Sequence, residues 1–282
     1  MADNGQYGYV DAAAISDMGL VRGNNEDSYA SIPEAGCFVV ADGMGGGDAG
    51  EVASDMVVTC IREAVSSAAD DSPGCRKYAI QQSLHKANAK VVEYRDGHGF
   101  ASMGSTVVML VLNPWNASEP FACHVGDSRL YCYRDGELFC ITRDHSVGNE
   151  MKSRGVKEEL PDKVAKALTR VVGGSGLLVP EWQKIALCPN DVFLLCSDGL
   201  LFIPDSEIEA VIRDFKAPKA IVEELRKRVL TTRAPDNLTA VCIRVGAEIP
   251  LPTEVDKYEQ EESDLLLKVA EERKDYGANV AK

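Results

Sequence analysis

The sequence predicts an α+β domain in which antiparallel sheets are covered by helices. Short segments typical of β-strands dominate the middle and the end of the 282-residue chain, and helical segments come in two pairs. Strands and helices do not alternate one by one, as they would around a parallel sheet. Hydrophobic residues make up 45% of the chain, which is enough for one large core without disulfide bonds or a structural metal.

The strand segments are short, β-branched or aromatic, and bounded by Gly, Asp or Pro. Between two of them, Asp135-Gly136 predicts a hairpin, because this pair supplies the positive φ of a tight turn. A further strand region is expected directly after Glu26-Asp27. The other predicted strands cover residues 9–16, 37–41, 106–112, 121–125, 130–133, 138–142, 192–197 and 240–245.

Apolar residues at helical spacing predict four helices whose stripes face the core. In the first half, one helix carries Val52, Met56, Cys60 and Ala64, and the next carries Ile80, Leu84, Ala87 and Val91. In the second half, Ser206 with Glu209 resembles a capping box for a helix that ends near Arg213. Pro218 opens a last helix, which carries Ile221, Leu225 and Val229.

We expect residues 1–247 to form one domain and residues 248–282 to form an acidic C-terminal extension. Pro250 and Pro252 interrupt the pattern after the last strand, and the extension holds ten acidic and five basic side chains. Ser263 is a candidate cap for a helix that ends near Asp275. Two interpretations of the extension stay open: a solvated or self-docked segment, and a partner-binding segment.

Composition excludes several classes of partner. The formal net charge of −14 repels phosphate backbones, which disfavours nucleic acid. The sequence has no run of about 18 apolar residues, and its polar start lacks the features of a signal peptide. Nine cysteines without a Cys-x-x-Cys pair predict free thiols in a reducing compartment. We therefore expect a cytoplasmic monomer with no membrane or nucleic-acid partner.

Acidic residues next to small residues recur where predicted strands end. Asp42-Gly43, Asp127-Ser128 and Asp198-Gly199 each follow an apolar run. One Asp-Gly pair is usually a turn, but carboxylates that converge at one sheet edge repel each other unless a cation neutralises them. Oxygen ligands, including a glycine carbonyl, select Mg²⁺ or Mn²⁺. Four widely spaced histidines and no cysteine motif disfavour zinc.

Nine short motifs follow one another along residues 7–245. They are Gly19-Leu20-Val21-Arg22 with Asn25-Glu26-Asp27-Ser28, Val40-Ala41-Asp42-Gly43-Met44-Gly45-Gly46, Gly50-Glu51-Val52-Ala53-Ser54, Met103-Gly104-Ser105-Thr106, Gly126-Asp127-Ser128-Arg129, Thr142-Arg143-Asp144-His145-Ser146, Ala167-Leu168-Thr169-Arg170, Ser197-Asp198-Gly199-Leu200 and Asp236-Asn237-Leu238-Thr239. Together they resemble the metal-dependent serine/threonine protein phosphatases of the type 2C (PPM) family, in the bacterial form. Each motif alone is weak, whereas nine in family order are a specific signal.

The resemblance implies a four-layer α-β-β-α sandwich of two antiparallel sheets flanked by helices, with residues 1–247 as the catalytic domain. It also implies hydrolysis of phosphoserine and phosphothreonine by direct attack of a bridging water that two Mn²⁺ or Mg²⁺ ions activate. The implied partners are phosphorylated proteins and a cognate serine/threonine kinase.

The resemblance also assigns roles to individual residues. It implies that Asp42 bridges both metals and that Gly43 adds its carbonyl oxygen. Asp198 and Asp236 hold one metal, and Glu26 reaches the other partly through water. Asp127, with Asp198, supplies the third metal site of bacterial relatives. Asp27 orients water, and Arg22 clamps the substrate phosphate, whose oxygens a planar guanidinium matches.

The sequence departs from the family pattern at a few positions. Met44 stands where many eukaryotic relatives carry a histidine proposed as a general acid, so water or another group must protonate the leaving oxygen. Gly47 replaces a histidine common in bacterial relatives. His145 is interpreted as a structural turn residue rather than a substitute acid.

Residues 147–166 correspond to the family's flap beside the active site. Lys152, Arg154 and Lys157 in this segment are equally compatible with phosphopeptide binding and with an ordinary solvated face.

Two alternative functions remain to be weighed. A non-catalytic pseudophosphatase would have lost metal carboxylates, and Asp42, Asp198 and Asp236 are all present. A phosphatase dedicated to an anti-sigma-factor antagonist would carry a sensor domain, which this sequence lacks.

Overall fold

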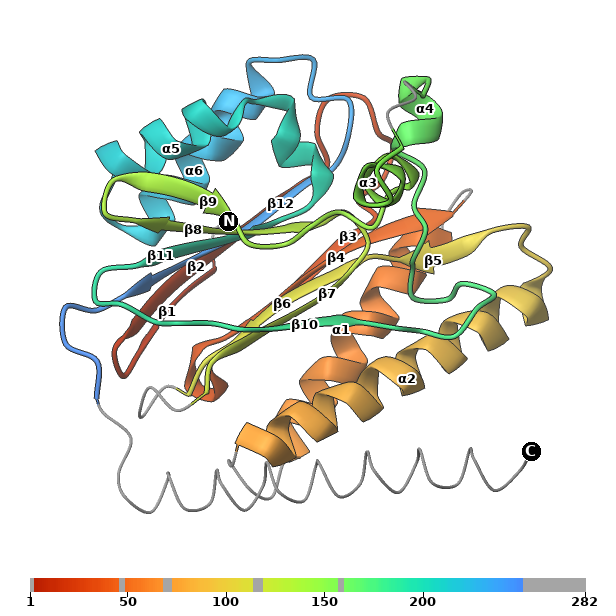
Figure 1. Cartoon of the computed structure of the whole chain (residues 1–282), viewed down its shortest axis with the longest axis horizontal. Coiled ribbons are helices and arrows are strands. Elements are labelled where there is room, and N and C mark those ends of the chain that lie inside the picture. Colours follow the sequence, from red (N-terminus) through yellow and green to blue (C-terminus); the bar gives the residue numbers. More distant parts are fainter. Residues whose placement is uncertain (1–2, 46–48, 68–72, 114–118, 157–159, 251–282) are drawn as a thin grey trace.

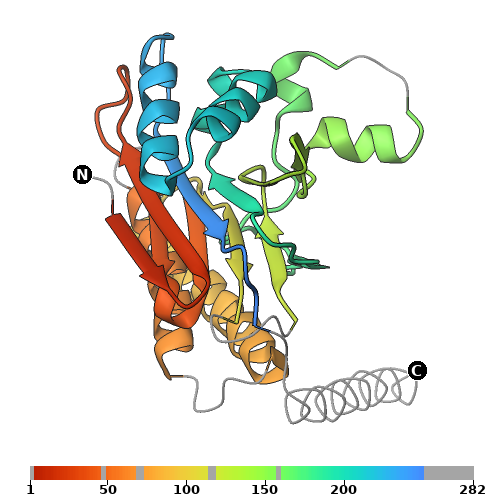
Figure 2. The ribbon, with the colours of Figure 1, turned by 90° about the vertical axis from the view of Figure 1, so that its left-hand side faces the viewer.

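The computed structural model describes residues 3–45, 49–67, 73–113, 119–156 and 160–250. Two antiparallel six-stranded sheets face each other, and a pair of helices covers the outer face of each sheet (Figure 1; Figure 2). This arrangement confirms the predicted four-layer α-β-β-α sandwich. The predicted helix near residues 263–275, Gly47 and Lys157 lie outside the described residues.

The first sheet joins the N-terminal hairpin to the C-terminal strands. Its order is β1 (Asp3–Tyr7), β2 (Val10–Asp17), β12 (Leu238–Val245), β11 (Val192–Cys196), β8 (Arg129–Arg134) and β9 (Glu137–Cys140). Asp135 and Gly136 connect β8 to β9 with φ values of 52° and 92°, so the predicted Asp-Gly hairpin is confirmed. Helices α5 (Asp205–Asp214) and α6 (Pro218–Leu230) pack on its outer face.

The second sheet is formed by the central part of the chain. Its order is β10 (Glu181–Lys184), β7 (Phe121–Val125), β6 (Val107–Val111), β4 (Cys37–Gly45) and β3 (Asp27–Ile32), and β5 (Met103–Ser105) pairs with the end of β4. Helices α1 (Ala49–Ser67) and α2 (Pro73–His98) cover it. The short helices α3 (Val147–Ser153) and α4 (Asp162–Ala165) form the flap at one end of the sandwich (Figure 1). The 3-10 turns η1 (Pro33–Ala35) and η2 (Asp198–Phe202) complete the described elements.

Alternating side chains of the central strands fill two different cores. In β4, Phe38 and Val40 point between the sheets, whereas Val39 and Ala41 point toward α1 and α2. Successive side chains of a strand face opposite sides of the sheet, so a strand covered on both sides is apolar throughout. This explains the continuous apolar runs that the sequence shows at these strands.

Several predicted boundaries need correction. Helix α5 begins at Asp205 with Pro204 as its N-cap, so Ser206 is inside the helix and does not cap it. The predicted strand at residues 106–112 corresponds to β6 (Val107–Val111), and the short strand β5 (Met103–Ser105) that precedes it was not predicted. Strands β1 and β10 were not predicted, because neither carries an alternating apolar pattern.

The helix stripes agree with the structure in part. Ile80, Leu84, Ala87 and Val91 are all buried in α2, as predicted. In α1 the most buried face is Ala53, Val57 and Ile61, one position away from the predicted stripe, of which Cys60 alone is fully buried. All nine cysteines are free, as predicted. Within the described part of the chain, no helix has the length and apolar character needed to cross a bilayer.

Candidate active site

A pocket of about 500 Å³ opens at the end of the sandwich where the acidic strand ends meet. Its lining includes seven of the eight predicted site residues, and only Asp27 is outside it. The lining residues are Arg22, Glu26, Asp42, Gly43, Met44, Gly45, Thr106, Asp127, Lys166, Leu168, Val171, Asp198, Asp236 and Asn237. Residues from seven separate segments thus converge at one site.

The acidic residues reach the pocket because the strands of both sheets end or bend there. Asp198 follows β11, Asp127 lies in the turn between β7 and β8, and Asp236 precedes β12. Asp42 differs from the prediction, since it lies within β4 rather than after it. Strand β4 continues past Asp42 because Gly43 takes a new partner, Ser105 of β5.

The pocket holds far more negative than positive charge. Five carboxylates line it, and Arg22 and Lys166 are the cationic lining residues of the described chain. Burial and then the neighbouring acids Asp27 and Asp198 raise the pKa of Asp42 well above its usual range. Burial is also the largest cause that raises the pKa of Asp198 to about 7 and that of Asp127 to about 6. Oxygen donors in uncompensated excess fit Mg²⁺ or Mn²⁺, which neutralise charge and accept carboxylate ligands.

Glu26 is fixed by close contact between its own segment and the start of α1. The amide of Gly43 donates to the Glu26 carbonyl oxygen at 3.0 Å, and Ser54 Oγ donates to the same oxygen at 2.6 Å. The Glu26 amide donates to Asn237 Oδ1 at 2.9 Å. The carboxyl of Glu26 has a raised pKa because of burial, which Arg22 opposes. The backbone of Glu26 is therefore fixed, and its side chain lines the pocket.

Asp27 lies behind the pocket. Asp27 of β3 is the register partner of Asp42 in the neighbouring strand β4. Ser197 Oγ donates a hydrogen bond to the Asp27 carboxylate at 2.7 Å. The side chain is buried, and burial raises its pKa to about 6. The lining acids are therefore better placed than Asp27 to hold a metal, and the role of Asp27 in orienting water stays a prediction.

Arg22 lies at the mouth of the pocket and is exposed. Its Nη2 donates to Asp236 Oδ2 at 2.8 Å, and its Nη1 lies 3.8 Å from Glu26 Oε2. The hydrogen bond with Asp236 is the main cause of its raised pKa. The guanidinium is thus close to two candidate metal ligands and free to contact a phosphoryl group from the solvent side.

Three residues at the site were not predicted. Lys166 follows the flap helix α4, and its ammonium helps to lower the pKa of both Asp127 and Asp198. Thr106 Oγ1 accepts the Asp42 amide at 2.9 Å. Asn237 Nδ2 donates to the carbonyl oxygens of Met18 and Asn24, each at 2.9 Å. Thr106 and Asn237 belong to motifs of the sequence, whereas nothing in the sequence distinguishes Lys166 from other surface lysines.

The structure also shows where Met44 and His145, discussed above with the family pattern, lie relative to the pocket. Met44 lines the pocket and offers no proton. His145 is buried outside the pocket lining, as expected of a structural residue. In the flap, Lys152 lines the groove next to the pocket and Arg154 is exposed beside Glu150. Both interpretations of the flap cations therefore stay open.

The fold and this site define a class of protein: an α-β-β-α sandwich with an acidic pocket whose oxygen donors fit divalent cations. The family described as Protein phosphatase 2C has a model that matches residues 22–241. The chain therefore belongs to the protein phosphatase 2C family, as the motifs predicted, and its enzyme class is that of a protein phosphatase.

Individual relatives are similar over most of the chain. The serine/threonine phosphatase Stp of Listeria monocytogenes is 27% identical over 238 residues, which span 81% of this chain and 93% of the relative. PstP of Mycobacterium tuberculosis is 34% identical over 238 residues, which span 81% of this chain and 44% of the relative.

Solved structures are also similar to this chain. PppA, a regulatory component of T6SS in Pseudomonas aeruginosa, is 37% identical with a TM-score of 0.76 and covers 85% of this chain and 99% of its own. The catalytic domain of PstP in complex with two manganese ions is 29% identical with a TM-score of 0.69 and covers 84% of this chain and 98% of its own.

The raised pKa values predict that metal stabilises the protein in a pH-dependent way. Asp27, Asp127 and Asp198 bind protons more tightly in the metal-free folded protein than in the unfolded chain. Their contribution to stability is present at acid pH and is lost as the pH rises through about 6 to 7. In EDTA, the Tm should therefore fall between acid and alkaline pH. Mn²⁺ should raise the Tm much more at the alkaline end, and an equal effect at both ends would contradict this.

Proposed function

We propose that this protein removes phosphate from phosphoserine and phosphothreonine of protein substrates, with two Mn²⁺ or Mg²⁺ ions held by Asp42, the Gly43 carbonyl, Glu26, Asp198 and Asp236. The observation that carries the proposal is a pocket lined, in the described part of the chain, by five carboxylates and by only two cationic side chains, Arg22 and Lys166. Asp127, together with Asp198, is the candidate for a third ion. The relative of known structure that binds two manganese ions supports the choice of metal.

When bound, the ions supply charge neutralisation and an activated water for in-line attack on phosphorus. The pocket lining of the described chain contains no serine, cysteine or histidine. Thr106 is the single hydroxyl there, and its Oγ1 is engaged with the Asp42 amide and with Ser128 Oγ. With the pocket carboxylates assigned to the metals, this lining supports direct attack of water without a phosphoenzyme. Arg22 at the pocket mouth orients the phosphoryl oxygens.

The alternative of a pseudophosphatase has less support, because all five predicted metal carboxylates line the pocket. We further propose that the protein acts as a monomer in the cytoplasm and opposes a serine/threonine kinase.

Turnover by the purified protein tests the proposal. We expect hydrolysis of para-nitrophenyl phosphate and of a phosphothreonine peptide in Mn²⁺, with less or equal activity in Mg²⁺ and none in EDTA. Readdition of Mn²⁺ should restore the rate. If a folded protein shows no turnover with either metal, the enzyme proposal fails and the pseudophosphatase alternative gains.

Arg22→Ala is expected to weaken substrate binding more than the chemical step. A charge-assisted hydrogen bond to phosphate contributes about 1.5–3 kcal/mol, so kcat/KM should fall about 10- to 100-fold, mostly through KM. Steady-state kinetics on para-nitrophenyl phosphate measures this. Arg213→Ala on α5 is the matched control, because Arg213 is exposed and pairs with its neighbour Asp214. A normal KM for Arg22→Ala would contradict the clamp role.

A further inference from the structure

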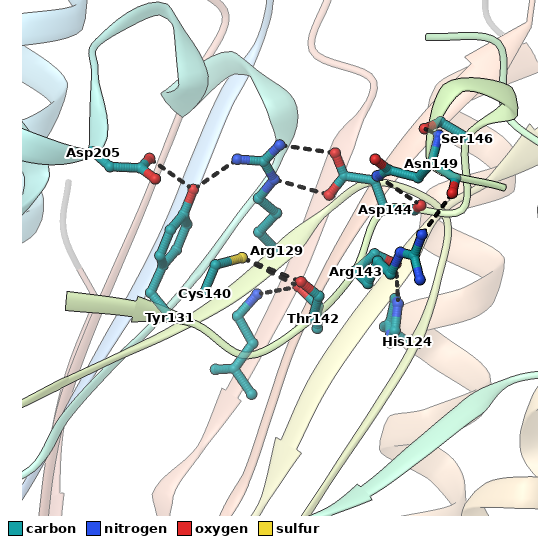
Figure 3. A network of polar contacts seen from close by, with 11 residues as sticks. His124, Arg129, Tyr131, Cys140, Thr142, Arg143, Asp144, Ser146, Asn149 and Asp205 are labelled. Atoms are coloured by element: carbon teal, nitrogen blue, oxygen red, sulfur yellow. Dashed lines mark hydrogen bonds and ion pairs between the residues drawn. The ribbon is translucent and has the colours of Figure 1, made fainter. Parts of the chain in front are cut away.

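Asp127 lies in a turn that residues 144–145 contact both before and after Asp127. After Asp127, Arg129 donates from Nε and Nη2 to the two carboxylate oxygens of Asp144, at 2.9 and 2.8 Å (Figure 3). Before it, the His145 amide donates to the Gly126 carbonyl oxygen at 2.9 Å. Asp144 and His145 are neighbours in sequence, so residues 144–145 set the position of the turn.

The His145 ring adds the contact that determines the orientation of Gly126. The Gly126 amide donates to His145 Nδ1 at 3.1 Å, in a buried environment. Gly126 has a φ of +105°, and a Cβ there would lie 2.6 Å from Thr106 Cγ2. The backbone before Asp127 thus has one conformation, held by an acceptor on the imidazole ring.

The environment of the ring selects the tautomer that can accept this hydrogen bond. Because Nδ1 accepts, the proton must be on Nε2, and Nε2 lies 3.2 Å from Glu181 Oε2, which accepts it. Arg170 Nη1 lies 3.3 Å from the same nitrogen. Since arginine only donates, this contact is not a hydrogen bond in the Nε2–H tautomer, which the Gly126 amide requires, and Arg170 adds positive charge there. Burial and neighbouring His124 lower the pKa of His145 to about 4, so the ring stays neutral at physiological pH.

The same cluster could be mistaken for a metal site. His124, His145 and Glu181 each offer a ligand atom, and these atoms lie within 4.8 Å of one another. His124 and His145 stack with centroids 4.4 Å apart, and His124 Nε2 donates to the Arg143 carbonyl oxygen at 3.0 Å (Figure 3). However, a metal at His145 Nε2 would have to replace its proton while Nδ1 still accepts an amide, and it would lie beside Arg170. The contacts therefore favour a hydrogen-bond network over a cation.

We propose that His145 is a positioning residue for Asp127: its neutral ring, held as the Nε2–H tautomer by Glu181, fixes the Gly126 amide and so aims the Asp127 carboxylate into the pocket. The effect on metal binding rests on the proposed function, in which Asp127 takes part in a third metal site. The positioning itself concerns only contacts within the chain.

Two variants of His145 distinguish the role of Nδ1 as a hydrogen-bond acceptor from the role of the side chain in filling space. His145→Leu removes the acceptor and keeps an apolar side chain, whereas His145→Asn keeps an acceptor oxygen near the place of Nδ1. We expect His145→Leu to speed hydrogen exchange of the Gly126 and Asp127 amides and to weaken the weakest Mn²⁺-binding step in calorimetry about tenfold. His145→Asn should restore both within about threefold, and the tighter Mn²⁺ steps should change little in either variant.

Nuclear magnetic resonance on the wild-type protein provides a test that needs no variant. In ¹⁵N-labelled protein, Nδ1 of His145 should be unprotonated and scalar-coupled to the Gly126 amide. The opposite tautomer, or unchanged amide exchange in a folded His145→Leu protein, would overturn the proposal. So would tight Zn²⁺ binding that His124→Ala abolishes. If the wild-type protein shows no third Mn²⁺-binding step, the proposed role of Asp127 fails instead, and amide exchange with the tautomer decides the positioning.

Discussion

Asp42→Asn is expected to abolish phosphatase activity, with a loss on the order of a thousandfold or more, which corresponds to about 4 kcal/mol of transition-state stabilisation. Asp42 is the electrostatic centre of the pocket, because Asp27, Asp198, Asp127 and Asp236 all act on its pKa. An asparagine keeps the shape and removes the charge that, in the proposed function, holds cations between these acids. Hydrolysis of para-nitrophenyl phosphate at saturating Mn²⁺ measures the loss.

The control for this variant is Asp214→Asn, which changes an exposed carboxylate on α5 and should leave the rate unchanged. In the metal-free state, Asp42→Asn should also stabilise the protein, since it removes a carboxyl whose ionised form is disfavoured by burial and by the neighbouring acids. A variant that is stabilised in EDTA but inactive in Mn²⁺ would distinguish metal loss from misfolding. Substantial activity in Asp42→Asn would contradict the assignment of this residue to the metals.

The sequence patterns predicted most strands, because strands covered on both faces are apolar throughout, whereas the four-layer arrangement was predicted by the family resemblance. It did not predict β10, whose residues Glu181–Lys184 are mostly polar and whose one neighbour is β7. An edge strand of this kind is stabilised by backbone pairing to β7 rather than by its own side chains, so it carries no periodic signal. Glu181 and its contact with His145 were missed for the same reason.

At the site, the motifs predicted which acids converge but not how they are supported. The extension of β4 past Asp42 depends on pairing with β5, more than 50 residues later in the chain. The position of Lys166 depends on how the flap folds back over the pocket. Both are properties of tertiary packing, which local sequence patterns do not encode.

Gly43→Ala is expected to damage both the fold and the metal site, although it adds one methyl group. A Cβ at Gly43 would overlap the carbonyl oxygen of Gly50 and lie 2.6 Å from the carbonyl oxygen of Glu26. Both obstacles are backbone atoms, so no side-chain rotation relieves them. Overpacking of this kind costs about 2 kcal/mol, which lowers the Tm by about 5 °C. Because the Gly43 amide also binds the Glu26 carbonyl oxygen, activity should fall at least about 100-fold as Glu26 moves.

Gly97→Ala is the matched control, because a Cβ at Gly97 would meet no atom within 4 Å. It lies in α2, where alanine is the better helix former, so the Tm should stay the same or rise slightly. Thermal unfolding and para-nitrophenyl phosphate kinetics compare the two variants. If Gly43→Ala keeps wild-type activity, the contact between β4 and the start of α1 does not hold Glu26 in place, and the ligand role of Glu26 must be reassigned. If it loses activity but keeps its Tm, the methyl group acts on the metal site directly, through the Gly43 carbonyl.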